Sequence, residues 1–203
     1  MSTGQDIEAA ITAKTAITGR SCGACSLCCK LLPIRELEKP ENQWCVHCRP
    51  GNGGCGIYAE RPASCRGFAC DWLVNPHLGD EWVPTRAKMF VHYNYDPLGN
   101  MGLYVVVDPA RPDSWRREPY FSQLKGRALH QLRTGKMRLY VTVGRQSFLI
   151  LPDAAVETTD KFHLVVPVGP DRWEARCFAT REEAMAASAR LKASRMAAFS
   201  GTP

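Results

Sequence analysis

The sequence lacks the long hydrophobic runs of a membrane protein. Nowhere in its 203 residues does a run approach the roughly 18 consecutive apolar residues of a membrane-spanning helix. The first twenty residues contain no apolar segment of the kind found in a secretory signal peptide. With 45% hydrophobic and 23% charged residues, the composition is that of an ordinary globular protein of one large or two small domains. We therefore expect a soluble, cytoplasmic protein whose cysteines stay reduced.

The sequence also lacks the short motifs of several common enzyme classes. It contains no Walker-type phosphate-binding loop and no GxGxxG loop placed between a predicted strand and a predicted helix, as dinucleotide binding requires. No arrangement of serine, histidine and aspartate and no paired-carboxylate signature indicates a hydrolase. No internal repeat is visible. The sequence therefore gives no support for hydrolase, nucleotide-binding or dehydrogenase chemistry, and whether the protein is an enzyme is left open.

Cysteine, in contrast, is abundant and concentrated in one stretch. Nine of the ten cysteines lie in that stretch, which begins with a CxxCxxCC run and continues with a CxxC pair. The nine are Cys22, Cys25, Cys28, Cys29, Cys45, Cys48, Cys55, Cys65 and Cys70. A thiolate is a soft anionic ligand, and two thiolates two residues apart on a tight turn can bind one tetrahedral ion. We predict a metal or iron–sulfur site, in preference to the disulfide framework that an oxidising compartment would allow.

The number of metal ions is left open by the spacing. Cys28 and Cys29 are adjacent, and neighbouring side chains point in different directions, so they imply two ions, or one cluster and a free thiol. Nine cysteines make two four-ligand sites with one spare, or one [4Fe-4S] or [2Fe-2S] cluster with several thiols left over. His47 is the only histidine placed to join the site, and we expect it at the surface or beside the ligands. Cys177 is distant in sequence, and we expect it to be buried in a core.

The cysteine-rich stretch has few signals of a hydrophobic core. It is rich in glycine and proline and has few apolar repeats, so metal–ligand bonds are the expected substitute for a core. Its charge is balanced, since residues 1–80 carry 8 basic and 8 acidic residues, whereas residues 81–203 carry 18 and 12. Four thiolates around a dication would leave a charge of about −2 on such a site. The metal-bound first part would then be acidic and the second part basic.

The second part of the chain has the periodicity of strands and helices. Alternating apolar residues predict strands over residues 88–94, 101–108, 137–144, 146–151, 162–168 and 173–178. Helical spacing predicts helices over 114–136, at least from Tyr120 onward, and over 181–199, the second with a capping box from Thr180 to Glu183. A weak helix is predicted over 5–17. We therefore predict an α+β fold, with a cysteine-rich lobe over residues 1–80 and an antiparallel sheet with two covering helices over residues 81–203.

Two stretches, CGACSLCC and GGCGIYAERPASCRGFACDWL, resemble the CxxCxxCC cysteine-cluster family, the YkgJ-like zinc- or iron-chelating domain. The resemblance covers roughly residues 20–74, about a quarter of the chain. It implies metal ligation by Cys22, Cys25, Cys28, Cys29, Cys55, Cys65 and Cys70, with Cys45 as the eighth ligand and Cys48 as the alternative. Some flagellin lysine methylases carry the same cluster, which by analogy implies iron–sulfur chemistry.

Several basic residues invite a functional interpretation. We expect Arg61 and Arg66 to lie beside the thiolates, because guanidinium groups stay charged and donate to sulfur or to backbone carbonyls. Tyr58 and Phe68 are expected to pack around the site. A second basic group could bind nucleic acid or an acidic partner, but we favour a solvated helix face. This group comprises Arg116, Arg117, Lys125, Arg127, Arg133, Lys136 and Arg138.

Two functions follow from these observations. In the first, the protein is a metal-handling or partner-docking module whose cysteine cluster holds zinc or iron, either as ions or as an iron–sulfur cluster. In the second, it is an iron–sulfur enzyme or electron carrier with a substrate pocket against the sheet of the second part.

Overall fold

The computed structural model describes residues 4–51, 53–96, 98–135 and 137–200, with side chains as far as residue 194. The chain divides into two compact units that are not continuous in sequence. The first unit comprises Met1–Tyr93, Tyr104–Phe121 and Val141–Gly144, and the second comprises Asn94–Leu103, Ser122–Tyr140 and Arg145–Pro203. The division of the chain at residues 80 and 81 stays a prediction.

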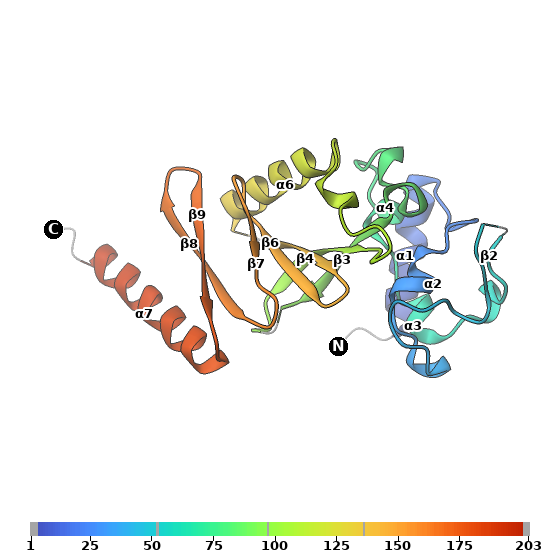
Figure 1. The fold of residues 1–203 in the computed structure, drawn as a ribbon, viewed down its shortest axis with the longest axis horizontal. Helices are drawn as coiled ribbons and strands as arrows, with labels where there is room; N and C mark the ends of the chain where they lie inside the picture. Colours follow the sequence, from blue (N-terminus) through green and yellow to red (C-terminus); the bar gives the residue numbers. More distant parts are fainter. Residues whose placement is uncertain (1–3, 52, 97, 136, 201–203) are drawn as a thin grey trace. The chain divides into compact units, whose positions relative to one another are not determined.

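The cysteine-rich part of the first unit is built from short elements (Figure 1). Its helices are α1 (Gly4–Thr18), α2 (Leu27–Leu31), α3 (Ala63–Arg66), α4 (Asp71–Val74) and α5 (Pro84–Ala87). The described part of the first unit also has four 3₁₀ turns, at Arg35–Leu37, Tyr58–Glu60, Asp80–Trp82 and Ser114–Arg116. Two strands of two residues each, β1 (Cys48–Arg49) and β2 (Gly54–Cys55), form a short hairpin. The helix expected over residues 5–17 is confirmed as α1, which has no buried residue among those described.

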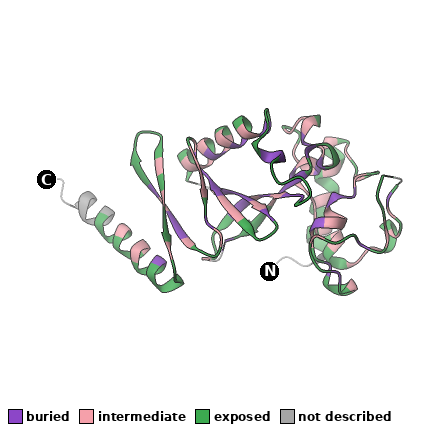
Figure 2. Cartoon of the chain, viewed as in Figure 1, coloured by how far each residue is buried: buried purple, intermediate pink, exposed green. Residues whose placement is uncertain are grey.

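A five-stranded sheet has its strands in the order in which they occur in the sequence. They are β3 (Met89–Tyr95), β4 (Met101–Val107), β5 (Arg138–Val143), β6 (Gln146–Ile150) and β7 (Ala155–Glu157). Figure 2 shows buried residues along these strands, and Met89, Val105 and Val141 are fully buried. The unit boundary falls within β3, β4 and β5, so both units contain part of the sheet.

The second unit also contains a separate two-stranded sheet. β8 (Phe162–Gly169) pairs antiparallel with β9 (Arg172–Phe178), and α7 (Arg181–Ser200) packs against both strands. The predicted capping box of α7 is confirmed, since the Glu183 N–H donates to Thr180 Oγ1 at 3.2 Å and the Thr180 N–H donates to Glu183 Oε2 at 3.3 Å. Ala184, one residue later, is fully buried.

The predicted α+β class with antiparallel strands is confirmed, and its details are refined. The six predicted strands are β3, β4, β5, β6, β8 and β9. β7 was missed because three residues carry too little alternation, and it forms an antiparallel pair with β6. The helix expected over residues 114–136, at least from Tyr120 onward, is confirmed from Tyr120, as α6 (Tyr120–Thr134); Pro119 separates it from the preceding 3₁₀ turn.

No helix in the described part of the chain is both long enough and apolar enough to cross a membrane.

One ion pair in the first unit joins the cysteine-rich part to the residue that follows β4. Lys30 Nζ lies 2.7 Å from Asp108 Oδ1 and 2.8 Å from Oδ2, and the two side chains are only 18% and 10% exposed. Asp108 Oδ1 also accepts the Ala110 N–H at 2.9 Å. Because the pair is largely shielded from water, its loss leaves an uncompensated charge.

We predict that Asp108→Asn lowers the free energy of unfolding by about 1 to 3 kcal/mol, because Lys30 then keeps a half-buried charge without its partner. Urea denaturation followed by circular dichroism measures the change. Asp113→Asn, at an exposed position whose side chain forms no cap hydrogen bond, is the matched control and should change the stability by less than about 0.5 kcal/mol. Equal effects of the two substitutions would contradict the role of the ion pair.

Candidate metal centre

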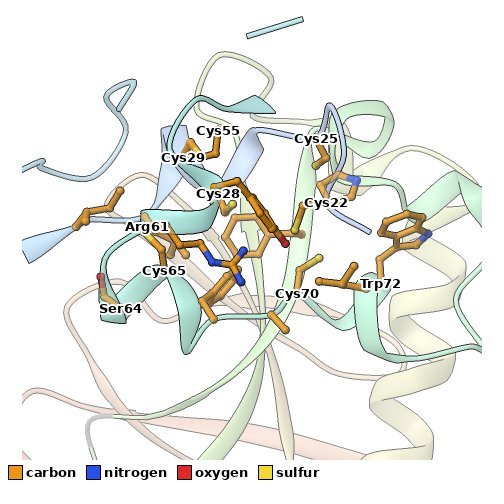
Figure 3. A pocket seen from close by; sticks show the side chains of 18 of the residues that line it. Cys22, Cys25, Cys28, Cys29, Cys55, Arg61, Ser64, Cys65, Cys70 and Trp72 are labelled. Atoms are coloured by element: carbon orange, nitrogen blue, oxygen red, sulfur yellow. The ribbon is translucent and has the colours of Figure 1, made fainter. Parts of the chain in front are cut away.

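Seven of the eight cysteines expected to bind metal line one small cavity in the first unit, with a volume of about 100 Å³ (Figure 3). The seven are Cys22, Cys25, Cys28, Cys29, Cys55, Cys65 and Cys70. Leu32, Ile34, Phe68, Leu73 and Phe90 form the apolar part of the wall. The cavity therefore combines thiol ligands with surroundings that limit the access of water.

Three segments of the chain bring these cysteines together. The first segment is the turn before α2 together with α2, where the Cys25 N–H donates to the Cys22 carbonyl at 2.7 Å. The second is the β1–β2 hairpin, in which Cys48 and Cys55 are directly opposite each other. The third carries Cys65 within α3 and Cys70 at the start of α4. The sequence separates these segments, and only tertiary contacts place them around one space.

A close backbone contact holds the hairpin against the first turn. Gly54 has a φ of +71°, and a Cβ built on it would collide with the carbonyl oxygen of Gly23. Only glycine allows both this left-handed conformation and this contact. The contact keeps β2, and with it Cys55, beside the turn between Cys22 and Cys25.

A second group of contacts ties the segment after Cys70 to the end of α1. The Thr18 hydroxyl donates to the Leu73 carbonyl at 2.8 Å. The Arg20 guanidinium lies 4.9 Å from the Trp72 ring centroid and donates to three carbonyls. These acceptors are Trp72 O at 2.5 Å, Asn75 O at 2.9 Å and Leu78 O at 2.6 Å. Arg20 thereby positions both the first and the last cysteine of the cluster.

Backbone N–H groups lie close to two of the sulfurs, as expected of thiolate ligands on tight turns. The N–H groups of Leu27 and Thr85 lower the pKa of Cys25, and the Leu73 N–H, which donates to the Cys70 carbonyl at 3.0 Å, acts in the same direction on the pKa of Cys70. Such groups stabilise the anionic form of sulfur. Burial acts in the opposite direction and, with the neighbouring Cys22 and Cys25 thiolates, raises the pKa of Cys70 to about 12. Burial likewise raises the pKa values of the Cys22, Cys25 and Cys65 thiols.

The thiols of Cys28, Cys29 and Cys48 form a chain of hydrogen bonds. The Cys48 thiol donates to Cys29, and the Cys29 thiol donates to Cys28. The bond to Cys28, followed by burial, raises the pKa of Cys29. Burial, together with the Cys29 charge, raises the pKa of Cys48 to about 11. The adjacent Cys28 and Cys29 sulfurs thus lie within hydrogen-bonding reach, although neighbouring side chains were expected to diverge.

For the eighth ligand, the resemblance implied Cys45, with Cys48 as the alternative. Neither Cys45 nor Cys48 is part of the cavity wall. Cys45 is 6% exposed and its N–H donates to the Cys29 carbonyl at 3.0 Å, whereas Cys48 reaches Cys29 through its sulfur. Both cysteines therefore adjoin Cys29, and the assignment of Cys45 stays a prediction.

Arg61 enters the cavity itself. Figure 3 shows its side chain extending between Cys65 and Cys70, and its guanidinium stacks on the Tyr58 ring at 4.0 Å. Arg61 Nε is buried and has no hydrogen-bond partner among the described residues. The charge of Arg61 lowers the pKa of Cys22, although burial raises that pKa more strongly. A buried donor without a partner is costly, and it fits a site that an anionic thiolate group completes.

Arg66 was expected to act like Arg61 but lies outside the cavity wall. Its Nη1 donates to the Arg61 carbonyl at 2.6 Å, and its Nε lies 3.4 Å from Glu8 Oε2 on α1. Arg66 therefore holds the backbone of Arg61 in place. Donation to a backbone carbonyl was one of the two kinds of contact expected for these arginines.

Lys39 is a buried cation that the sequence reasoning missed. It is 8% exposed, and its Nζ donates to the carbonyls of Lys30 at 3.2 Å, Leu32 at 2.5 Å and Pro40 at 2.7 Å. Burial lowers its pKa, while the charges of Cys45, Cys29, Cys28 and Cys65 raise it. A single lysine among loop residues gives no pattern in the sequence, so only the fold could identify this charge beside the thiols.

Three further expectations concern residues away from the cavity. Cys177 was expected in a core, and this was wrong, because it is exposed on β9, one of the two strands of a small sheet. His47 is half-buried, and its carbonyl accepts the Gly56 N–H at 2.7 Å. Among the basic residues, Arg133 pairs with Asp171 at 2.6 Å and Lys136 lies outside the described residues. A nucleic-acid or acidic-partner surface stays a prediction.

The fit of a metal depends on donor chemistry rather than on a preformed geometry. Within residues 4–51, 53–96, 98–135 and 137–200, no group of three cysteine, histidine or acidic side chains is already arranged to hold an ion. All ten cysteines are free thiols. Because sulfur ligands, N–H donors to sulfur and the partnerless Arg61 Nε surround one space, the residues fit a thiolate-bound metal once their side chains turn inward.

No family model, no curated protein and no solved structure matches the chain. The family resemblance of the cysteine pattern therefore stays a prediction.

We predict that Gly54→Ala weakens the packing of the β1–β2 hairpin on the Cys22–Cys25 turn. The new Cβ would collide with the Gly23 carbonyl, in addition to the strain of a positive φ. The matched control is Gly51→Ala, because Gly51 has a φ of +80° but a Cβ there meets nothing within 4 Å. The expected result in urea denaturation is a loss of stability at least about 1 kcal/mol larger for Gly54→Ala. Equal losses would show that the contact with Gly23 contributes nothing.

Proposed function

We infer that the cysteine-lined cavity binds zinc or iron through thiolate ligands. The observation that carries this proposal is the gathering of seven cysteines from separate parts of the chain around one cavity of about 100 Å³. In a reducing compartment cysteines stay as thiols, and nine of them close together are open to oxidation unless a metal binds them. The proposal therefore includes a cytoplasmic location and membership of the YkgJ-like cysteine-cluster family.

The electrostatic contacts link the proposed ligands into one continuous set. In addition to burial, the charges of Cys22 and Cys25 raise the pKa of Cys70, and the charge of Cys29 raises the pKa values of Cys22, Cys25 and Cys65. Four sulfurs complete one tetrahedral ion, so two ions would divide this set of thiols between them. The seven sulfurs of the cavity can instead surround one iron–sulfur cluster, with thiols to spare.

The charged residues suit either arrangement. A site of four thiolates and a dication carries a charge of about −2, and burying it without compensation would be unfavourable. Arg61 in the cavity and Lys39 behind Cys28 and Cys29 supply two positive charges close to the sulfurs. Their contribution is to stabilise thiolates in a half-buried cavity with a partly apolar wall.

The role of the bound metal follows from its type. Zinc would hold the three cysteine segments together, as in a metal-handling or partner-docking module, and an iron–sulfur cluster would supply electron transfer. The iron–sulfur enzyme or electron carrier is kept as the second candidate because Phe68 and Phe90 pack edge to face at 5.5 Å in the cavity wall. Such apolar enclosure is one of the means by which proteins tune the potential of a cluster.

We predict that Cys25→Ser and Cys65→Ser each lower the metal content of anaerobically purified, reduced protein, because an alcohol is a poor ligand at neutral pH. Elemental analysis measures zinc and iron, and a brown colour identifies an iron–sulfur cluster. Cys28→Ser and Cys70→Ser should act similarly, but these two side chains also pack against the cluster of Leu27, Leu31 and Phe90. Their effects therefore include a packing loss, which circular dichroism would detect.

The control for this series is Cys177→Ser, which changes an exposed thiol away from the cavity and should leave the metal content unchanged. Of the pair near Cys29, we expect Cys45→Ser to reduce the metal content and Cys48→Ser to be tolerated. Full metal content in Cys25→Ser, Cys65→Ser, Cys28→Ser and Cys70→Ser would refute the assigned ligands.

We also predict that removing the metal from reduced protein unfolds the cysteine-rich part while the sheet persists. The helices of this part after α1 have only four or five residues each, so metal bonds replace much of a core. Limited proteolysis with and without a chelator measures the effect, and new cleavage should fall within residues 20–72. Protection of that segment in chelated, reduced protein would contradict the prediction.

A further inference from the structure

The second unit contains a larger cavity that the proposed metal site does not explain. Its volume is about 600 Å³, within the range of small-molecule sites in proteins. Its wall comes from the last turns of α6, the beginnings of β4 and β5, and the β8–β9 hairpin; Figure 1 labels α6, β4, β8 and β9. All of the lining residues belong to the second unit, so the cavity is a feature of that unit alone.

One side of this cavity is apolar and includes an aromatic ring. Val165, Pro167 and Trp173 lie on the same face of the β8–β9 sheet, because Pro167 and Trp173 are directly opposite each other and Val165 is two residues from Pro167. Met101, at the start of β4, is 47% exposed and adds a flexible apolar group. A flat organic group can stack on Trp173 with this surface around it.

The cavity has one cation whose charge is not fully paired. Arg138 is 25% exposed, and its Nη1 lies 3.7 Å from Asp96 Oδ2, beyond hydrogen-bonding distance. Asp96 is already occupied, since it accepts the N–H groups of Leu98 at 2.9 Å and Asn100 at 2.8 Å and the Tyr140 hydroxyl at 3.4 Å. Arg138 is thus held in place while keeping donors for another anion.

The other lining arginine has a different role. Arg133 forms a two-point contact with Asp171, at 2.7 Å from its Nε and 2.6 Å from its Nη2. Its charge is neutralised, and Asp171 brings a carboxylate close to the cavity. A ligand with two negative charges is therefore disfavoured, whereas a monoanion matches Arg138.

Gln131 supplies a specific polar contact. Its Oε1 is buried and accepts no hydrogen bond among the described residues. A buried acceptor without a donor is unfavourable, so a turn of this side chain that presents Oε1 to the cavity breaks no hydrogen bond. In that turned position Gln131 favours a ligand that carries an O–H or N–H group as well as its negative charge.

We propose that this cavity binds a small aromatic monocarboxylate that also carries a hydrogen-bond donor. The carboxylate binds the Arg138 guanidinium, the ring stacks on Trp173, and the donor group contacts Gln131 Oε1. This binding site is independent of the metal centre, since none of the lining residues is a cysteine.

The test uses the whole 203-residue chain as purified under reducing conditions and three probes, namely 4-hydroxybenzoate, benzoate and the neutral 4-hydroxybenzamide. Calorimetric titration or ligand-detected NMR measures each Kd. We expect 4-hydroxybenzoate to bind about ten-fold more tightly than the amide, because a charge-assisted pair with Arg138 is lost in the amide. Failure of wild-type protein to bind 4-hydroxybenzoate at millimolar concentration, or equal affinities for acid and amide, would overturn the proposal.

Substitutions assign the contacts. Arg138→Gln should raise the Kd of 4-hydroxybenzoate about ten-fold or more, whereas Arg145→Gln, at an exposed turn position outside the cavity, should leave it unchanged. Gln131→Leu should weaken binding of 4-hydroxybenzoate but not of benzoate, a difference that general damage to the fold would not produce. If Arg138→Gln does not fold, Arg138→Lys and Gln131→Leu decide the question, and unchanged binding in both would refute the site.

Discussion

The cysteine-rich part of the first unit, residues 20–72, depends on one constraint, the gathering of many thiols in a small space with few fully buried hydrophobic residues of its own. Helices of four and five residues cannot position seven cysteines by packing alone. The chain uses polar and backbone contacts instead. Arg20 binds three carbonyls after Cys70, Gly54 allows the hairpin to approach Gly23, and Lys30 pairs with Asp108. Each of these contacts fixes the position of a segment that carries cysteines.

Gathering thiols also creates an electrostatic problem, and the buried cations address it. Burial and mutual repulsion raise the pKa values of the thiols, which opposes the thiolate form that a metal requires. The charges of Arg61 and Lys39 oppose this effect, together with N–H groups near Cys25 and Cys70. A cation that binds the sulfurs would remove the remaining repulsion. The proposed metal function and the placement of these two residues thus have the same physical basis.

In the second unit the proposed binding site is a cavity between a helix and strands, not a cluster of cysteines. The β8–β9 hairpin turns one face toward α7 and the other toward the 600 Å³ cavity. Asp96 organises the turn between β3 and β4 through its bonds to Leu98 and Asn100 and at the same time orients Arg138. The basic stretch that suggested a binding surface therefore contains two arginines in distinct roles, one neutralised by Asp171 and one left with free donors.

The sequence by itself determined the features that depend on neighbouring residues. The cysteine spacing, the hairpin strands, the capping box of α7 and the α+β class all arise from local patterns, since turns, caps and strand alternation involve residues a few positions apart. Only the tertiary structure decided which distant residues meet. It placed Lys39 beside the thiols, linked Cys48 to Cys29, exposed Cys177 and brought Gln131, Arg138 and Trp173 to one cavity. These relations depend on contacts between residues up to 42 positions apart, as for Gln131 and Trp173. A local pattern contains no information about which face of a strand or loop another segment will cover.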